Sequence, residues 1–118
     1  MATKPTTVEV RRLGPWASVI GIGGDVTSAS EVVLLAAYAR ASADEARVIV
    51  LDFGRLDYMN SGGIGLLVTI LIRAQREDRR LMAVGLSEHY RQILALTRLD
   101  EAIGIHATEG EALAAAGR

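Results

Sequence analysis

The most chemically suggestive segment of the chain is a serine followed by two glycines, Ser61-Gly62-Gly63, between an apolar stretch and a helical pattern. In open α/β sheets, binding sites form where a central strand passes into a helix. Ser61 would lie at the helix N-terminus, beside free backbone N–H groups and the positive end of the helix dipole. Gly62 and Gly63 would leave the backbone open to the close approach of another molecule. The same residues are typical of a plain helix cap and a tight turn, and spacing alone favours that interpretation.

Other reactive residue types are sparse. The chain has no cysteine and two histidines, which excludes disulfides, thiol catalysis and a histidine-rich metal site. His89 and His106 have no partner at metal-ligand spacing, so we interpret both as surface or packing residues. Asp25 and Asp52 lie near predicted strand ends and could approach Ser61, although loop aspartates are more often turn formers. Because no Gly-x-Ser-x-Gly elbow occurs, we expect no enzymatic activity. The scarcity of cysteine and histidine predicts no metal site, and we expect no cofactor.

Nucleotide and nucleic-acid binding are disfavoured by motif and composition. The pattern GxxxxGK[ST] does not occur, and the Gly-Ile-Gly-Gly string at 21–24 is not a dinucleotide fingerprint. The formal net charge is -1, from 13 Lys and Arg against 14 Asp and Glu, so no general basic character is available for nucleic acid. Aromatic residues make up only 4% of the chain, which also argues against a base-stacking platform.

Helix geometry predicts which side of the segment 61–76 faces the sheet. At about 100° per residue, one apolar stripe should be buried. That stripe comprises Ile64, Leu67, Val68 and Leu71, and the opposite face carries Gly62, Leu66, Thr69 and Arg73. Leu66 would then be exposed beside Ser61 and the smooth surface of Gly62. A single exposed leucine is common, but this combination is more typical of a small docking surface.

The elements around this segment alternate between strands and helices. We expect strands over 7–13, 16–22, 47–53, 81–86 and 103–106, and helices over 28–41, 61–76, from 88 and from 109. A strand break is predicted at 23–25 and a loop over 54–60. The order ββαβαβαβα predicts an α/β fold with a mostly parallel sheet and right-handed crossovers. The leading hairpin supplies one antiparallel edge strand.

Length and composition fit a single domain over residues 1–118, half of which are hydrophobic. The N-terminal segment has no apolar core after its charge, so no signal peptide is expected. No apolar run approaches the roughly 20 residues that span a bilayer. We therefore expect a small cytoplasmic domain with no direct contact to membrane or nucleic acid.

Two segments resemble the STAS domain, and more closely the bacterial anti-sigma factor antagonists. They are Val-Ile-Val-Leu-Asp-Phe at 48–53 and Tyr-Met-Asn-Ser-Gly-Gly-Ile-Gly-Leu-Leu at 58–67. That family has a strand ending in aspartate, then a segment of the type Met-Asp-Ser-Ser-Gly-Leu-Gly. Gly24-Asp25 before the first helix and residues 94–100 before the last strand also fit. The resemblance covers nearly the whole chain and implies a STAS-like fold.

The resemblance also implies a function. In the family, the first serine of the motif is phosphorylated by an anti-sigma factor, a serine kinase of the histidine-kinase-like ATPase type, and a serine phosphatase restores it. The unphosphorylated antagonist binds that kinase and frees the sigma factor. Ser61 matches the phosphorylated position, while Asn60 stands where the family often has aspartate and Gly62 where it often has serine or threonine. The expected partner-binding residues are Asp25, Asn60, Ser61, Gly62, Gly63, Leu66 and Thr69.

Two alternatives remain open. The chain could be a STAS scaffold, or a subunit of a larger signalling or lipid-transport complex, without a serine switch. It could also be an enzyme with Ser61 as nucleophile, against which the missing elbow counts.

Overall fold

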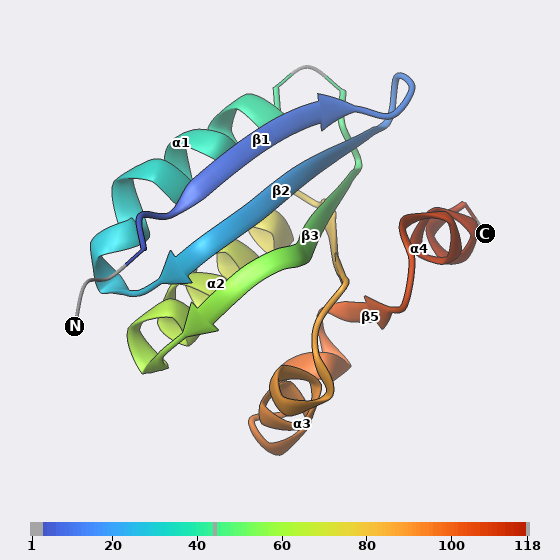
Figure 1. Cartoon of the computed structure of the whole chain (residues 1–118). Helices are drawn as coiled ribbons and strands as arrows, with labels where there is room; N and C mark the ends of the chain where they lie inside the picture. Colours follow the sequence, from blue (N-terminus) through green and yellow to red (C-terminus); the bar gives the residue numbers. More distant parts are fainter. Residues whose placement is uncertain (1–3, 44, 118) are drawn as a thin grey trace.

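The computed structural model describes residues 4–43 and 45–117 (Figure 1). The elements in chain order are β1 (Thr7–Arg12), β2 (Ala17–Val26), the 3-10 turn η1 (Ser28–Ser30), α1 (Glu31–Ala41), β3 (Val48–Met59), α2 (Ser61–Arg76), β4 (Arg80–Val84), α3 (Glu88–Leu96), the 3-10 turn η2 (Leu99–Glu101), β5 (Gly104–His106) and α4 (Glu109–Ala116). This is the predicted order ββαβαβαβα, and the bounds predicted for α2 are confirmed.

The five strands form one sheet in the order β1-β2-β3-β4-β5. Only β1 is antiparallel to its neighbour, and the other three pairs are parallel. The predicted mostly parallel sheet with an antiparallel edge strand is therefore confirmed. Each strand after β1 pairs with the strand that precedes it in the chain, and a helix connects every parallel pair.

Helices cover the two faces of the sheet unequally. Ile20 and Ile22 of β2 belong to the larger core cluster, which includes buried residues of α1, α2 and α3. Val19 and Val50 alternate with the larger cluster's residues and point to the other face, where they cluster with Ala112 of α4. In Figure 1, α1 and α2 lie behind β1, β2 and β3, and α4 lies to one side. The larger core thus lies between the sheet and the helices α1, α2 and α3, and α2 begins at Ser61.

Strands β2 and β3 are longer than the sequence pattern predicts. β2 continues through 23–25, and β3 continues through 54–59, so the predicted break and loop are both wrong. The extensions pair with each other, with Gly24 opposite Leu56 and Val26 opposite Met59. Two register shifts accommodate the glycines, and Gly24 has a φ of 74°. Mutual pairing satisfies these backbone groups although the composition is typical of a turn.

The buried side of α2 differs from the predicted one. Its buried residues are Gly63, Leu66, Leu67, Ile70, Leu71 and Ala74. Leu67 and Leu71 are buried as expected, whereas Leu66 is 5% exposed, so its predicted outward placement is wrong. A side chain at Gly63 would overlap the Val26 carbonyl. Because the helix approaches β2 closely at Gly63, positions three, four and seven residues later are buried, whereas Ile64 is only partly buried against the larger core and Val68 is partly exposed.

Among the described residues, no helix combines the length and the apolar character needed to cross a membrane.

Candidate functional site

The residue that caps α2 is Asn60, and Ser61 is the first residue of the helix. Asn60 has an extended backbone, and its side-chain Oδ1 accepts a hydrogen bond from the Gly63 N–H at 3.0 Å. The Asn60 carbonyl accepts from the Ile64 N–H at 3.0 Å, and the Asn60 N–H donates to the Val26 carbonyl at 3.3 Å. The interpretation of Ser61 as a plain helix cap is therefore wrong, because its neighbour has that role.

The Ser61 side chain is exposed at the start of α2. Its hydroxyl makes no hydrogen bond with any residue that the structure describes, and neither does the backbone N–H of Ser61 or Gly62. The hydroxyl lies at the positive end of a 16-residue helix. A phosphate there would add about −1.5 to −2 charge next to unused N–H donors. The position can therefore carry an anionic group without disturbing the fold.

The two glycines after Ser61 are packed against the chain itself. A Cβ at Gly62 would lie 2.8 Å from the backbone nitrogen of Ser28 in η1, and one at Gly63 would lie 2.7 Å from Met59 Cγ. The predicted open backbone at Gly62 and Gly63 is therefore wrong. These glycines let α2 begin close to η1 and β2, and so they fix where Ser61 emerges. The glycine with open space is Gly65, where a Cβ would meet nothing within 4 Å.

The surface beside Ser61 is the solvent-facing side of α2. We define the outer face of α2 as Ser61, Gly65, Val68, Thr69 and Ile72. Thr69 is exposed as expected, and its hydroxyl donates to the Gly65 carbonyl at 3.1 Å. Ile72 is 44% exposed. The outer face of α2 is therefore smooth and partly apolar, and it does not include Leu66.

Asp25 organises the N-terminal segment and makes no hydrogen bond or ion pair with Ser61. Its Oδ2 accepts from the Lys4 N–H at 3.1 Å, and its carbonyl accepts from the Thr6 hydroxyl at 2.7 Å. The Lys4 Nζ lies 3.2 Å from Asp57 Oδ1, and both side chains are exposed. This segment therefore borders the end of the sheet from which α2 starts. We call this segment, residues 4–6, the N-terminal strap. The sequence pattern does not predict it, because its polar residues are also typical of a loop.

The remaining candidates lie elsewhere. Asp52 shares the β3 face of Val50, away from α2, and its Oδ1 accepts from the Gly54 N–H at 2.9 Å. His89 contacts the ring of Tyr90 edge-on, and the Tyr90 hydroxyl accepts from the Met59 N–H at 2.8 Å. That bond ties α3 to the strand that precedes Ser61, a link without a sequence signal. Within residues 4–43 and 45–117, no three His, Asp or Glu residues gather as metal ligands would.

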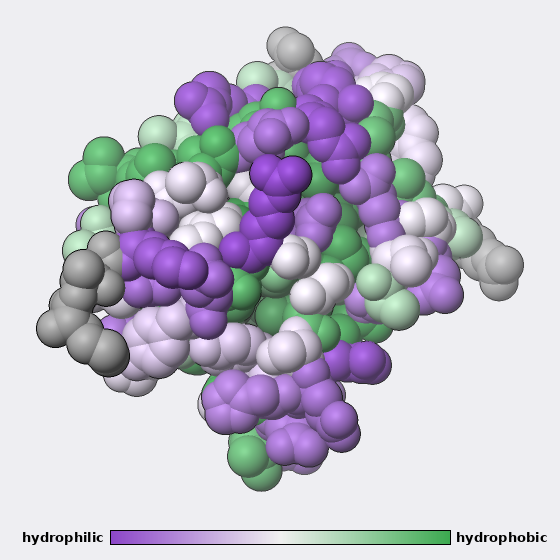
Figure 2. All heavy atoms as spheres, viewed as in Figure 1, coloured by the Kyte–Doolittle hydropathy of each residue, from purple (hydrophilic) through white to green (hydrophobic). Residues whose placement is uncertain are grey.

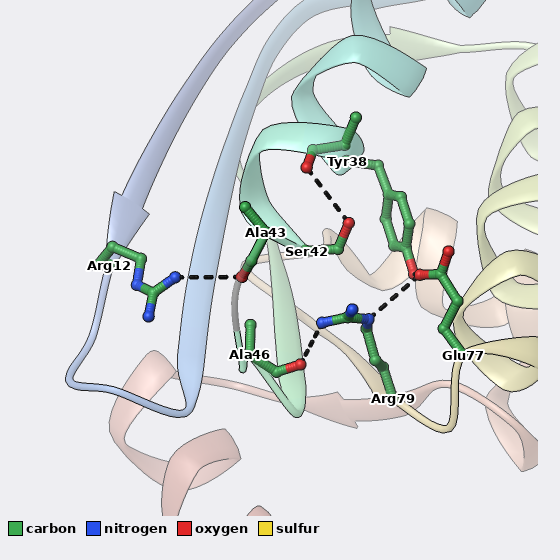
Figure 3. A network of polar contacts seen from close by, with 8 residues as sticks. Arg12, Tyr38, Ser42, Ala43, Ala46, Glu77 and Arg79 are labelled. Carbon is green, nitrogen blue, oxygen red and sulfur yellow. Dashed lines mark hydrogen bonds and ion pairs between the residues drawn. The ribbon is translucent and has the colours of Figure 1, made fainter.

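A polar network joins α1 to the opposite end of α2 (Figure 3). The Tyr38 hydroxyl donates to Glu77 Oε1 at 2.8 Å, and Arg79 Nε donates to the same oxygen at 3.2 Å. Arg79 also donates to the Ala46 carbonyl before β3. Burial of the phenol, and then its hydrogen bond to Glu77, raise the pKa of Tyr38 to about 12. The network anchors the end of α2 that lies away from Ser61.

Comparison with known proteins identifies the family. The family model described as Mlab, STAS domain, matches residues 10–106. The chain belongs to the STAS-domain family. Among solved structures, this STAS domain is similar to an anti-sigma factor antagonist from Mycobacterium paratuberculosis, with a TM-score of 0.80 and 22% identity over 94% of this chain and 93% of that one.

A second similarity is to the Bacillus cell fate determinant SpoIIAA in its phosphorylated form. The TM-score is 0.71 and the identity 21%, over 93% of this chain and 99% of that one. SpoIIAA in its unphosphorylated form gives 0.72 and 20%, over 93% and 97%. At these identities the likeness concerns the fold, and it agrees with the sheet order and crossovers described above.

Proposed function

We propose that this STAS domain is an anti-sigma factor antagonist, and that phosphorylation of Ser61 switches it off. In this proposal the unphosphorylated form binds an anti-sigma serine kinase of the histidine-kinase-like ATPase type and releases the sigma factor. The observation that carries the proposal is the Ser61 hydroxyl, which is exposed and makes no hydrogen bond with the described residues, at the start of a helix that Asn60 already caps. The fold of known antagonists, including SpoIIAA in phosphorylated and unphosphorylated forms, supports it.

The outer face of α2 is the proposed docking surface for the kinase. Gly65 and Val68 lie one and two turns from Ser61, so a partner seated there covers the hydroxyl. A phosphate dianion covered by that partner would lose its hydration without gaining a partner charge, which weakens binding. Ile72 replaces Leu66 as the apolar contact, because Leu66 belongs to the core.

The other residues of the motif have supporting roles in this proposal. Asn60, Gly62 and Gly63 set the first turn of α2 and thereby the direction of the Ser61 hydroxyl. Asp25 holds the N-terminal strap at the rim of the surface. A serine phosphatase would remove the phosphate, which remains accessible at an exposed helix start. Because Asn60 is neutral, the kinase would meet no carboxylate directly before the acceptor.

The test compares Ser61→Ala and Ser61→Asp with the control Ser28→Ala. Ser28 is also exposed and lies at the same end of the molecule, but it is not the proposed acceptor. Each protein is incubated with ATP and a candidate histidine-kinase-like ATPase from the same organism, and intact mass is recorded. We expect one phosphate on the native and Ser28→Ala proteins and none on the Ser61 variants.

Calorimetry then separates a switch from a scaffold. We expect Ser61→Ala to bind the kinase at least as well as the native protein, and Ser61→Asp to bind it much more weakly. Both should keep native stability within about 0.5 kcal/mol, because Ser61 is not the cap. Equal affinities of the alanine and aspartate forms, with no phosphate on Ser61, would instead indicate a STAS scaffold in a larger complex.

A further inference from the structure

The face of the sheet away from α1 and α2 is only partly covered. α4 packs over Val19 and Val50, and beyond it β1, β2 and β3 form a hollow of about 570 Å³. In Figure 1 no helix crosses the front of these three strands. Figure 2, seen from the same side, shows hydrophilic side chains over this face. The hollow lies on the side of the sheet opposite α2, so it is separate from the surface proposed for the kinase.

The strand register arranges the lining residues in two rows across β1, β2 and β3. The first row is Glu9, Gly21 and Asp52, and the second is Thr7, Gly23 and Arg55. Successive rows on one face are about 7 Å apart, and the outer members of a row are about 10 Å apart. The first row therefore presents two carboxylates across a glycine, and the second presents a hydroxyl and a guanidinium.

Gly21 borders a register shift between β2 and β3, and the space over its Cα is open. Its φ is not positive, and a Cβ there would meet only Glu9, at an ordinary 3.7 Å. Gly23 differs, because a Cβ there would lie 2.7 Å from Thr7 Oγ1. A β-branched residue would suit the middle of a central strand better than glycine. A strand glycine marks a bulge or a place where a ligand approaches the backbone closely, and Gly21 both borders the register shift and leaves its side-chain position open to a ligand.

The charged groups of the hollow have bonding capacity to spare. Arg55 is exposed and makes no hydrogen bond or ion pair with the part of the chain that the structure describes, and the same holds for the Glu9 carboxylate. Asp52 uses Oδ1 for the Gly54 N–H, and its Oδ2 makes no hydrogen bond there. Arg11 is held by Glu109 of α4 at 2.6 Å and closes the end of the hollow, and its positive charge also interacts with the Glu9 and Asp52 carboxylates.

We propose that this hollow binds a small zwitterion, an amino acid whose ammonium and carboxylate groups are separated by a short chain. The ammonium group lies over Gly21, within reach of Glu9 and Asp52. The carboxylate lies in the second row, where Arg55 binds it and the Thr7 hydroxyl donates to it. A molecule with only one of the two charges leaves one row without a partner, so both charges are needed for affinity.

The experiment is an NMR titration of the isotope-labelled protein with β-alanine, γ-aminobutyrate and 5-aminovalerate, which differ only in chain length. Butyrate and butylamine serve as probes with one charge each. We expect saturable shifts of the Gly21 and Gly54 amide signals with at least one zwitterion. We expect affinities about tenfold weaker, or no saturation, with butyrate and butylamine. No saturation with any zwitterion at tens of millimolar, or equal affinity for a singly charged probe, overturns the proposal.

Two variants test the geometry. Gly21→Val should fold with an unchanged or higher melting temperature, because the space is free, and should abolish the saturable shifts of Gly54. Gly65→Ala, another unobstructed glycine but on the outer face of α2, should bind as the native protein does. Should Gly21→Val fail to fold, Arg55→Gln decides, with an expected loss of about tenfold in affinity. Native affinity in a folded Gly21→Val or in Arg55→Gln overturns the proposal.

Discussion

Two glycines of α2, two residues apart, should respond to alanine with opposite signs. A methyl group at Gly65 meets nothing within 4 Å, so Gly65→Ala changes only the backbone's conformational freedom and should stabilise by about 0.5–1 kcal/mol. A methyl group at Gly63 overlaps the Val26 carbonyl and comes 2.7 Å from Met59 Cγ. The carbonyl cannot rotate away, because the Asn60 N–H donates to it within the packed end of β2. Overpacking of this kind costs about 1–3 kcal/mol.

Subtracting the helix gain leaves Gly63→Ala destabilised by up to about 2 kcal/mol, and because the helix gain is common to both variants, they differ by the overpacking cost of about 1–3 kcal/mol. With an m value of about 2 kcal/mol/M, urea midpoints would differ by about 0.5–1.5 M. Equilibrium unfolding followed by circular dichroism measures this difference directly. If Gly63→Ala proved as stable as Gly65→Ala, α2 would not be seated on β2 at Gly63. The explanation for the burial of Leu66 would then fail.

Two further outcomes concern the core and pH. Leu66→Ala should cost about 2–5 kcal/mol in urea unfolding, because Leu66 is 5% exposed; a change below about 0.5 kcal/mol would place Leu66 at the surface. The Tyr38 pKa is raised to about 12 from the ordinary 10.0, so the folded state favours the neutral phenol. The contribution of this shift to the stability of the protein is complete below pH 10 and is lost as pH rises towards 12. Relative to Tyr38→Phe, the native protein should therefore lose about 1 kcal/mol of stability between pH 8 and pH 11, and parallel pH profiles would refute the shift.

Alternation of apolar strands and amphipathic helices was enough to predict the sheet and its edge strand. It failed at 23–25 and 54–59, where glycines and charged residues are typical of turns. There the two strand extensions stabilise each other through pairing, a long-range effect that local composition does not contain. The Asn60 cap was missed for a related reason, because both Asn60 and Ser61 are good caps, and only the start of the helix decides between them.

The position of Ser61 could be predicted, but the surface around it could not. The apolar residues of α2 permit two neighbouring phases, and both bury Leu67 and Leu71. The choice between them depends on the close approach at Gly63, which is a property of packing and not of periodicity. The sequence therefore favours a backbone open to a partner at Gly62 and Gly63, whereas in the structure η1 and β2 pack against these two residues. A glycine in a sequence indicates that a side chain would not fit at that position, but it does not identify the neighbouring group that occupies the space.

The agreement between strand order and chain order has a consequence for biosynthesis. After β1, every strand of the sheet finds its partner among residues already made, although each parallel pair can form only once the helical crossover between its strands has closed. Growth of the sheet can therefore follow translation. The apolar patch that includes Val19 and Val50 is the exception, because the helix that shields it, α4, is made last. For most of its synthesis the nascent chain exposes this patch, which makes it the place where chaperone contact or aggregation would begin.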